Sequence, residues 1–503
     1  MSQSVQRRMA TGAIWMVLFK LVERGLGLIS TLILARLLGP AEFGVIAMAM
    51  SFIVMGELLT AFGFDIAIIQ DPHATEQHYN TAWTCNFLMG LSVTLLMLSL
   101  APAIADFYGR PEVVWVVCAL AFGPLIAGAE NIGVVAFRKE LDFRREFKFQ
   151  VSRKFIGFAI VVPLALLLRS YWALVVGILV SKLAGTLISY LMHPFRPSFT
   201  LVKFKQLFRF SRWMLLNNVV GFFKERSSDF VIGRLYGAAP LGAYNVAYEL
   251  AHLPSTEIGA PINRALLPGF AKMGSAPEVK TAYASAVGVL AMLTLPAAAI
   301  IFVVAPFLVP VILGQKWLAA VPLMEVFAFN GALLLFHSSI SAVLMGRGFA
   351  GRVTASNTIY VMVLAAMLAL FAMGKGAVGA AYAVLLTTLA CTPIYLYQVW
   401  RALGIAPSVF ARAVGRPLIA ALATAALLRW GMPAYIPTMG LAATVGWLAG
   451  GVVAGGGIYF GLVAAQWYLV GRPEGAERAV LDRARGFLES GLGRRFSRAR
   501  QEP

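Results

Sequence analysis

The sequence predicts an all-α integral membrane protein of about 14 transmembrane helices, built from two parallel six-helix lobes plus two extra helices. Composition, the spacing of apolar runs and an internal repeat predict it. Hydrophobic residues make up 59% of the 503 residues, charged residues only 13%, and the mean hydropathy is +0.78. A soluble domain is typically about 45–50% apolar and about 25% charged. Most of the apolar surface must therefore face lipid, which excludes a cytosolic enzyme, a disordered protein and a secreted disulfide scaffold.

Apolar runs of membrane-spanning length recur along the chain. A transmembrane helix needs about 20 mostly apolar residues. The expected spans are 12–36, 43–66, 80–105, 112–136, 152–169, 171–192, 212–235, 241–268, 281–303, 317–345, 353–373, 377–398, 409–429 and 439–470. The apolar stretch 301–313, interrupted by Pro306 and Pro310, is placed as an extension of the ninth span.

The distribution of Lys and Arg orients these spans. With 14 spans, both chain ends lie on one side of the membrane. The loops on that side carry 29 Lys and Arg, the opposite loops carry 7, and the remaining 6 lie within spans. Basic residues concentrate in cytoplasmic loops. The sequence therefore predicts that both termini are cytoplasmic, and its net charge of +19 reflects topology and contact with anionic lipid rather than nucleic acid.

Two segments resemble each other at a constant offset of 198. The first reads LARLLGPAEFGVIAMA over 34–49 and the second reads IGRLYGAAPLGAYNVA over 232–247. The shared pattern R-L-x-G-x(4)-G indicates a repeat whose two copies run in the same direction, as in transporters with parallel halves. It predicts an N-terminal lobe at 1–195, a C-terminal lobe at 196–400, two added helices at 401–472 and a cytoplasmic tail at 473–503.

Charged residues inside the spans mark the candidate site, because an intramembrane charge costs about 2.5 kcal/mol or more. Three charges of span one share a helical face by their spacing of three and four. The candidates for a cationic, substrate-binding cavity are Lys20, Arg24, Lys224, Arg226, Asn217 and Asn218. The candidates for ion coupling or charge pairing are Glu23, Glu225, Asp229, Glu249 and His252. The alternative is that these residues form structural pairs between helices.

A cationic, water-filled cavity attracts an anionic ligand such as a phosphate or a uronic acid, which arginine binds through two parallel hydrogen bonds. Nearby acids and a histidine indicate Na⁺ or H⁺ as a coupling ion. We expect no metal, no other cofactor and no catalytic residue. The sequence has no P-loop, and its predicted external loops are too short for the acceptor chemistry of a membrane polymerase.

Two further segments indicate a membrane interface. Residues 198–212 alternate apolar and basic side chains before the seventh span. In the tail 473–503, an apolar stripe beside several arginines predicts a basic amphipathic helix on the membrane surface. A docking site for an assembly partner is the alternative for the tail.

Several motifs resemble a known family. They read LARLLGPAEFGVIAMA, FGFDIAIIQ, FRKELDFRREFKF, YGAAPLGAYNVAYELAHLP, INRALLPGFAKM and GQKW. Over about residues 5–400 the chain resembles polysaccharide exporters of the Wzx type, with the colanic acid exporter branch most similar. These belong to the multidrug/oligosaccharidyl-lipid/polysaccharide (MOP) exporter superfamily.

The resemblance implies two lobes of six helices around a cationic cavity, with cations on spans one and seven. It also implies a flippase that moves an undecaprenyl-diphosphate-linked oligosaccharide repeat unit across the inner membrane by alternating access, for exopolysaccharide, capsule or O-antigen assembly. Membrane lipids and the polymerase of the assembly pathway are the expected partners. Two alternatives stay open: an ion-coupled multidrug exporter of the same superfamily, and a membrane polysaccharide polymerase or ligase.

Overall fold

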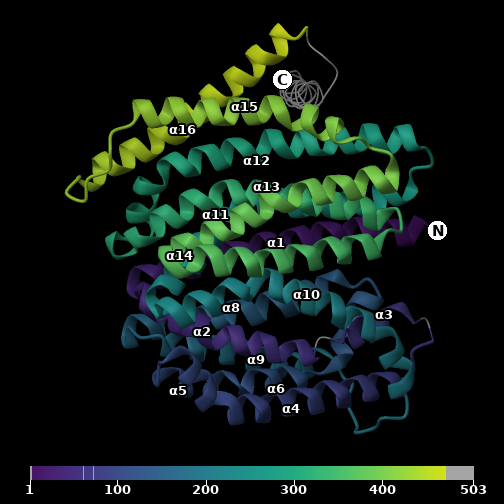
Figure 1. The fold of residues 1–503 in the computed structure, drawn as a ribbon. Coiled ribbons are helices and arrows are strands. Elements are labelled where there is room, and N and C mark those ends of the chain that lie inside the picture. The colour runs from purple at the N-terminus through teal and green to yellow at the C-terminus, as the bar shows by residue number, and fades with distance from the viewer. Residues whose placement is uncertain (1–2, 61, 72, 472–503) are drawn as a thin grey trace, which may run out of the picture. The chain divides into compact units, whose positions relative to one another are not determined.

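The structure is a computed structural model that describes residues 3–60, 62–71 and 73–471 (Figure 1). In that part of the chain every regular element is a helix, which confirms the all-α membrane fold. The helices are α1 (Gln3–Leu37), α2 (Pro40–Glu57), η1 (Leu58–Thr60), α3 (Phe64–Gln70), α4 (Glu76–Tyr108), α5 (Glu112–Leu120), α6 (Phe122–Gly128), η2 (Ile132–Val134), α7 (Val135–Lys139), α8 (Phe143–Leu168), α9 (Trp172–Met192), α10 (Phe204–Tyr236), α11 (Ala238–Lys272), α12 (Ala276–Ile312), η3 (Gln315–Ala320), α13 (Val321–Gly346), α14 (Ala350–Leu403), α15 (Pro407–Gly431) and α16 (Leu441–Leu469). The amphipathic helix predicted for the tail lies outside the described residues.

The long helices match the expected spans in order, but not all are apolar enough to be identified by composition alone. Among the described residues, nine helices pass a length-and-hydropathy test for spanning, or ten if the bent pair Glu112–Gly128 and Ile132–Lys139 is one span. One of the nine, α14, is broken at Lys375 and Gly376, between the expected eleventh and twelfth spans. The test leaves out α1, α10 and α11, which carry most of the charged candidates. The count of 14 therefore stays a prediction.

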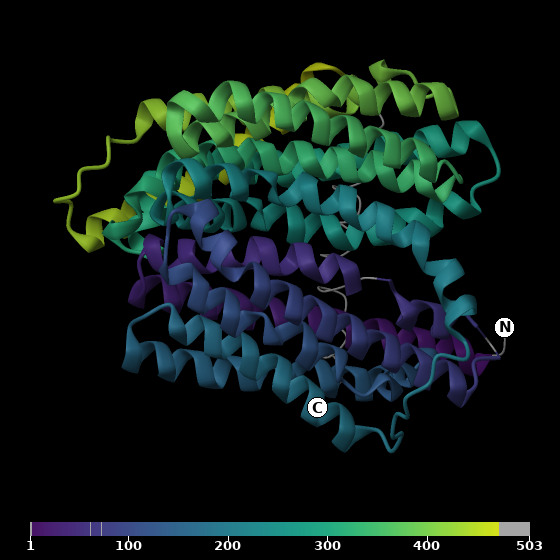
Figure 2. The same cartoon turned by 60° about the horizontal axis from the view of Figure 1, so that its bottom comes forward.

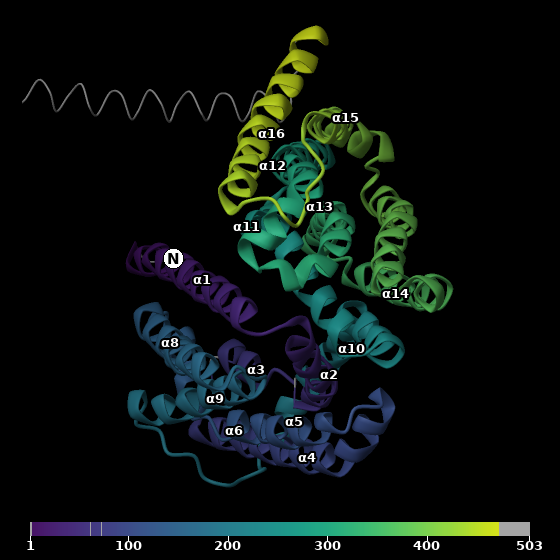
Figure 3. The ribbon, with the colours of Figure 1, turned by 90° about the vertical axis from the view of Figure 1, so that its left-hand side faces the viewer.

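The chain divides into two compact units. The first comprises Met1–Asn245 with Ile312–Trp317, and the second comprises Val246–Val311 with Leu318–Pro503. In the first unit α1 packs on α8, α4 on α6, and α10 on α2 and α4. In the second unit α13 packs on α14 and α15 on α16, as an end-on view shows (Figure 3). Helix α10 thus groups with the first unit rather than beginning the second, and the predicted domain boundaries stay predictions.

The fourth expected span, 112–136, is not one continuous helix. It is broken into α5, α6 and η2, and the two parts of the bent pair meet at 61°. The fully buried Asn131 explains the break. Its side chain accepts from the Gly133 amide at 2.9 Å and donates to the Phe195 carbonyl at 2.7 Å. Asparagine bonds of this kind compete with the helical ladder, and the turn they create precedes η2.

The repeated motif places its two arginines in equivalent positions. Arg36 Nε donates to the carbonyl of Ile312, the last residue of α12, at 2.9 Å. Arg234 donates to the carbonyls of Asp106 and Phe107 in the last turn of α4. In chain order α4 and α12 are the third long helices of the two copies. Each arginine therefore satisfies carbonyls at a helix C-terminus in the other copy, where the helix dipole favours a cation.

The second glycine of each motif copy packs against the backbone of the other copy. A Cβ added at Gly44 of α2 would overlap the backbone of Ala238, the first residue of α11. A Cβ added at Gly242 of α11 would overlap the backbone of Pro40, the first residue of α2. The two helices therefore cross at their N-terminal ends with backbone against backbone, which only glycine permits. We call these exchanged arginine and glycine contacts the repeat clasp; all its residues lie in the first unit.

Candidate functional site

A polar cavity of about 600 Å³ lies within the first unit. Residues of α2, α3, α4, α6, α8, α9 and α10 line it, together with short connecting segments. Its polar side chains are Glu57, Thr60, Asp65, Asn86, Glu130, Arg153, Lys182 and Asn218. So many ionisable groups on apolar helices indicate a wetted interior rather than a lipid-facing surface.

A short ion pair closes one wall of the polar cavity. Lys182 Nζ of α9 lies 2.6 Å from Glu57 Oε1 at the end of α2, and both side chains are about three-quarters buried. A Cβ at Gly123 of α6 would lie 3.1 Å from the same Nζ. The glycine therefore leaves room for the lysine, and each charge compensates the burial of the other.

A longer ion pair forms a second wall. Arg153 Nη1 of α8 lies 3.5 Å from Glu130 Oε2, in the break between α6 and η2. A Cβ at Gly185 of α9 would lie 2.6 Å from Arg153 Cδ, so this glycine makes space for the arginine stem. The break that Asn131 creates is thus what brings a carboxylate to the cavity.

The third carboxylate, Asp65, lies in the first turn of α3. It pairs with Arg138 Nη2 at 3.2 Å, and Arg138 Nε lies 3.9 Å from Glu146. Gly63, which precedes α3, has the left-handed φ of +67° that lets the chain turn into this helix.

The cavity lining can bind a hydroxylated ligand through many weak polar contacts. It holds three carboxylates, two cations and two amides, which together donate to and accept from sugar hydroxyls. The two cations offer charge-assisted bonds to a phosphate or a uronate, provided that the ligand replaces the carboxylate each now faces. The lining is formally not cationic, so it differs from the strongly positive chamber that the sequence predicts.

Of the predicted substrate-binding residues, Asn218 of α10 is in the lining of the polar cavity, as far as the structure describes it. The side chain of Asn217 is not among those described. Arg153 and Asn86 also line the cavity but were not predicted. From the sequence, Arg153 is counted with the basic loop before the fifth span, at the edge of the span expected from 152, whereas α8 already starts at Phe143. Its first turns are polar, yet Arg, Lys, Glu and Gln are good helix formers.

The charges of α1 form a separate cluster with α8. Glu23 pairs with Lys20 at 2.6 Å and with Lys154 of α8 at 3.5 Å. Lys20 also lies 5.1 Å from the ring centre of Phe19, and Arg24 is half-buried on the same helix. Lys20 and Lys154 thus share one acid, Glu23, and Arg24 follows that acid on α1.

The predicted charges of α10 and α11 have different surroundings. Arg226 Nη1 lies 3.0 Å from Asp229 Oδ2, whose side chain is only 2% exposed. Lys224 and Glu249 are half-buried, and Glu225 is exposed. The predicted roles of these residues in substrate binding and ion coupling remain proposals.

His252 belongs to a buried hydrogen-bonded network in the second unit. Its Nε2 lies 3.2 Å from Asn330 Nδ2, and its Nδ1 lies 2.8 Å from the Tyr248 carbonyl. Thr388 donates to Asn330 Oδ1 at 2.8 Å and lies 3.0 Å from the Tyr360 hydroxyl. The network ties α11, α13 and both parts of α14 together, which is a structural role that any ion coupling would have to disturb.

The sequence is similar to that of known membrane proteins of polysaccharide biosynthesis. The family model described as "Polysaccharide biosynthesis protein" matches residues 33–322. The chain is 25% identical over 353 residues to the lipopolysaccharide biosynthesis protein WzxC of Escherichia coli (strain K12), covering 68% of this chain and 71% of that protein. It is 26% identical over 340 residues to the succinoglycan biosynthesis transport protein ExoT of Rhizobium meliloti (strain 1021), covering 66% and 68%.

Among solved structures, the lipid II flippase MurJ in an inward closed conformation superposes with a TM-score of 0.74 at 12% identity, covering 90% of this chain and 99% of that chain. At that identity the likeness concerns the fold. The family match covers more than half of the sequence and includes the first motif copy, the polar cavity and the second motif copy. The chain belongs to the polysaccharide biosynthesis protein family of membrane proteins.

Proposed function

We propose that this multi-pass membrane protein is a flippase for a lipid-linked oligosaccharide. It moves an undecaprenyl-diphosphate-linked repeat unit from the cytoplasmic to the outer leaflet of the bacterial inner membrane by alternating access, with both termini cytoplasmic. Both relatives are named for polysaccharide biosynthesis, one of them as a transport protein, and the structural neighbour is named a lipid II flippase. Transport of this kind makes and breaks no covalent bond.

The observation that carries the proposal is the polar cavity within a unit of otherwise apolar helices. Oligosaccharides expose hydroxyls in every direction, and the amides of Asn86 and Asn218 with the paired charges supply donors and acceptors for them. We assign the diphosphate to the cations Lys20 and Arg24 of α1, because ammonium and guanidinium groups bind phosphate oxygens, while the polyprenyl chain stays in lipid. Na⁺ or H⁺ is the proposed coupling ion.

The test uses a bacterium that lacks its own exporter but makes a matching lipid-linked repeat. The wild-type chain should restore polymer at the cell surface. Arg24→Ala should reduce export about tenfold or more at equal protein level, because one guanidinium–phosphate contact contributes about 1.5–3 kcal/mol and 1.4 kcal/mol is a factor of about ten. Lys280→Ala, at an exposed lysine in the first turns of α12, is the matched control.

The position of accumulated intermediate separates the function classes. In cells lacking the chain, the proposal expects lipid-linked repeat on the cytoplasmic face, measured by its resistance to an external glycosidase. Accumulation on the outer face instead would identify a polymerase or ligase. Full export by Arg24→Ala would contradict the role given to that residue, and failure of the wild-type chain to export any lipid-linked repeat would refute the flippase.

A further inference from the structure

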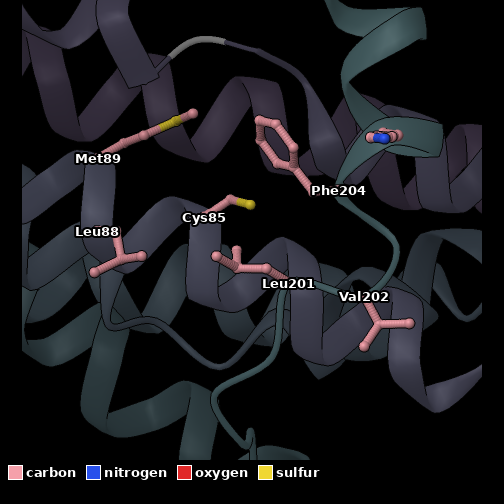
Figure 4. A pocket seen from close by; sticks show the side chains of 7 residues that line it. Cys85, Leu88, Met89, Leu201, Val202 and Phe204 are labelled. Atoms are coloured by element: carbon pink, nitrogen blue, oxygen red, sulfur yellow. The ribbon is translucent and has the colours of Figure 1, made fainter.

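A second cavity, of about 530 Å³, lies in the first unit and is lined mainly by apolar side chains (Figure 4). Cys85, Leu88 and Met89 of α4 form one wall, and Leu201, Val202 and Phe204 form the other. Lys205 is the basic residue of this lining. Its size falls within the roughly 300–1,000 Å³ typical of small-molecule sites. The cavity therefore has the shape and polarity of a site for one apolar chain with a negative head.

Leu201 and Val202 of the second wall belong to a non-helical segment, residues 194–203, which joins α9 to α10 and which we call the strap (Figure 2); Phe204 is the first residue of α10. Side chains of α4 bind its backbone. The Ser198 amide donates to Asn80 Oδ1 at 2.8 Å and the Thr200 amide to Thr84 Oγ1 at 3.0 Å. The Lys203 amide donates to Thr81 Oγ1 at 3.3 Å. Irregular backbone is tolerated next to lipid only where its polar groups are satisfied in this way.

The strap presents apolar side chains outward between basic ones. Phe199, Leu201 and Val202 are 65%, 51% and 72% exposed. Arg196, Lys203 and Lys205 stand among them in sequence. Apolar and basic side chains that alternate in this way are typical of segments at the boundary of an anionic membrane leaflet.

The cavity also joins the face that α4 exposes. Leu88, which lines the cavity, and Leu95 are 41% and 58% exposed, and their separation of seven places them on one side of the helix. A lipid chain lying along this side of α4 would reach the cavity past Ser92, whose hydroxyl donates to the Leu88 carbonyl at 2.8 Å. The head of that lipid would then meet Lys205 at the strap.

From this arrangement we propose that the cavity between α4 and the strap binds an anionic phospholipid, with one acyl chain among Cys85, Leu88 and Phe204 and the phosphate beside Lys205. The occupant is a bilayer lipid and not the transported molecule. A single lysine matches one phosphate, whereas a diphosphate bearing sugars needs the larger polar lining found elsewhere in this unit. Binding would fasten the strap, and with it the start of α10, to the membrane.

The experiment uses the purified full chain in nanodiscs and a phosphatidylglycerol that carries a diazirine midway along one acyl chain. After illumination, peptide mass spectrometry should find adducts on the peptides containing Cys85–Met89 and Leu201–Lys205. Lys205→Gln should lower that yield about fivefold, the value expected for one lysine near a lipid surface. Lys280→Gln, which removes an exposed lysine of the second unit, should leave it unchanged.

A second lipid probe and a second variant test the proposal further. The matching phosphatidylcholine probe lacks a net negative charge, so it should label the wild-type chain weakly. Its yield should equal the low yield of the phosphatidylglycerol probe on Lys205→Gln. Leu201→Trp, which fills the cavity from its open side, should remove the adducts on Cys85–Met89 while the thermal midpoint stays near that of wild type. Equal labelling by both lipids, or equal loss in Lys205→Gln and Lys280→Gln, would overturn the proposal. So would competition by a polyprenyl diphosphate that unlabelled phosphatidylglycerol cannot match.

Discussion

Substituting Gly44 with alanine tests the repeat clasp directly. The new Cβ would lie 1.7 Å from the Ala238 carbonyl oxygen and 2.3 Å from its carbonyl carbon, whereas carbon atoms in contact normally stand about 3.5–4.0 Å apart. The starts of α2 and α11 must therefore separate by more than about 1 Å, and overpacking of this kind costs roughly 1–3 kcal/mol or more. In an open helical position the same change would instead stabilise by about 0.4–1 kcal/mol. At the repeat clasp, the glycine-to-alanine change is therefore expected to destabilise the protein, whereas in an open helical position it stabilises.

The assay is the thermal midpoint of the purified chain, followed by loss of monodisperse protein after heating. Gly27→Ala is the matched control, since a Cβ at Gly27 of α1 meets nothing within 4 Å. We expect Gly44→Ala and Gly242→Ala each to lower the midpoint relative to Gly27→Ala. The double variant should lose less than the sum of both, because one separation relieves both overlaps. Midpoints for Gly44→Ala and Gly242→Ala at or above that of Gly27→Ala would refute the reasoning.

Three other outcomes follow from the contacts. Lys182→Ala should reduce polymer export and destabilise the protein by about 1–3 kcal/mol, because it leaves the Glu57 carboxylate uncompensated. The exchanged pair Glu57→Lys with Lys182→Glu should recover stability, and no recovery would mean that the ion pair does not stabilise this wall of the polar cavity. Asn131→Ala should cost a similar roughly 1–3 kcal/mol, seen as a lower thermal midpoint, since buried backbone groups of Gly133 and Phe195 lose their partner; an unchanged midpoint would mean that another group maintains the break. Thr388→Val should destabilise the second unit through Asn330, and adding Asn330→Leu should remove part of that loss; a simple sum of the two losses would argue against the network.

Composition and apolar periodicity predicted the fold class because lipid leaves few alternatives to long helices. The positions of most helices followed from hydropathy. The break in the fourth span did not, since Asn131 is held by Ser189, His193 and Phe195, about 60 residues further along the chain. A single polar residue in an apolar run gives no sign of which partners it will find.

The site was predicted in part. Glu57, Asp65, Glu130 and Lys182 stand out in the sequence as intramembrane charges, yet nothing in their spacing indicates that they share one cavity. Glu57 and Lys182, for example, are 125 residues apart. Arg153 was hidden in a basic run that reads as a loop. Asn218 was found because it lies on a helix whose other polar residues had already drawn attention.

The contacts of Arg36, Arg234, Gly44 and Gly242 have the form of an isologous interface, in which residue i of one subunit meets residue j of its twin and the reverse holds as well. Here both halves of that relation are encoded in a single polypeptide. A symmetric dimer cannot alter one side of its contact without altering the other. This chain can, and it already has proline at the start of one helix where the other begins with alanine. Because both copies stand in one chain, either side of this contact can change while the other is kept.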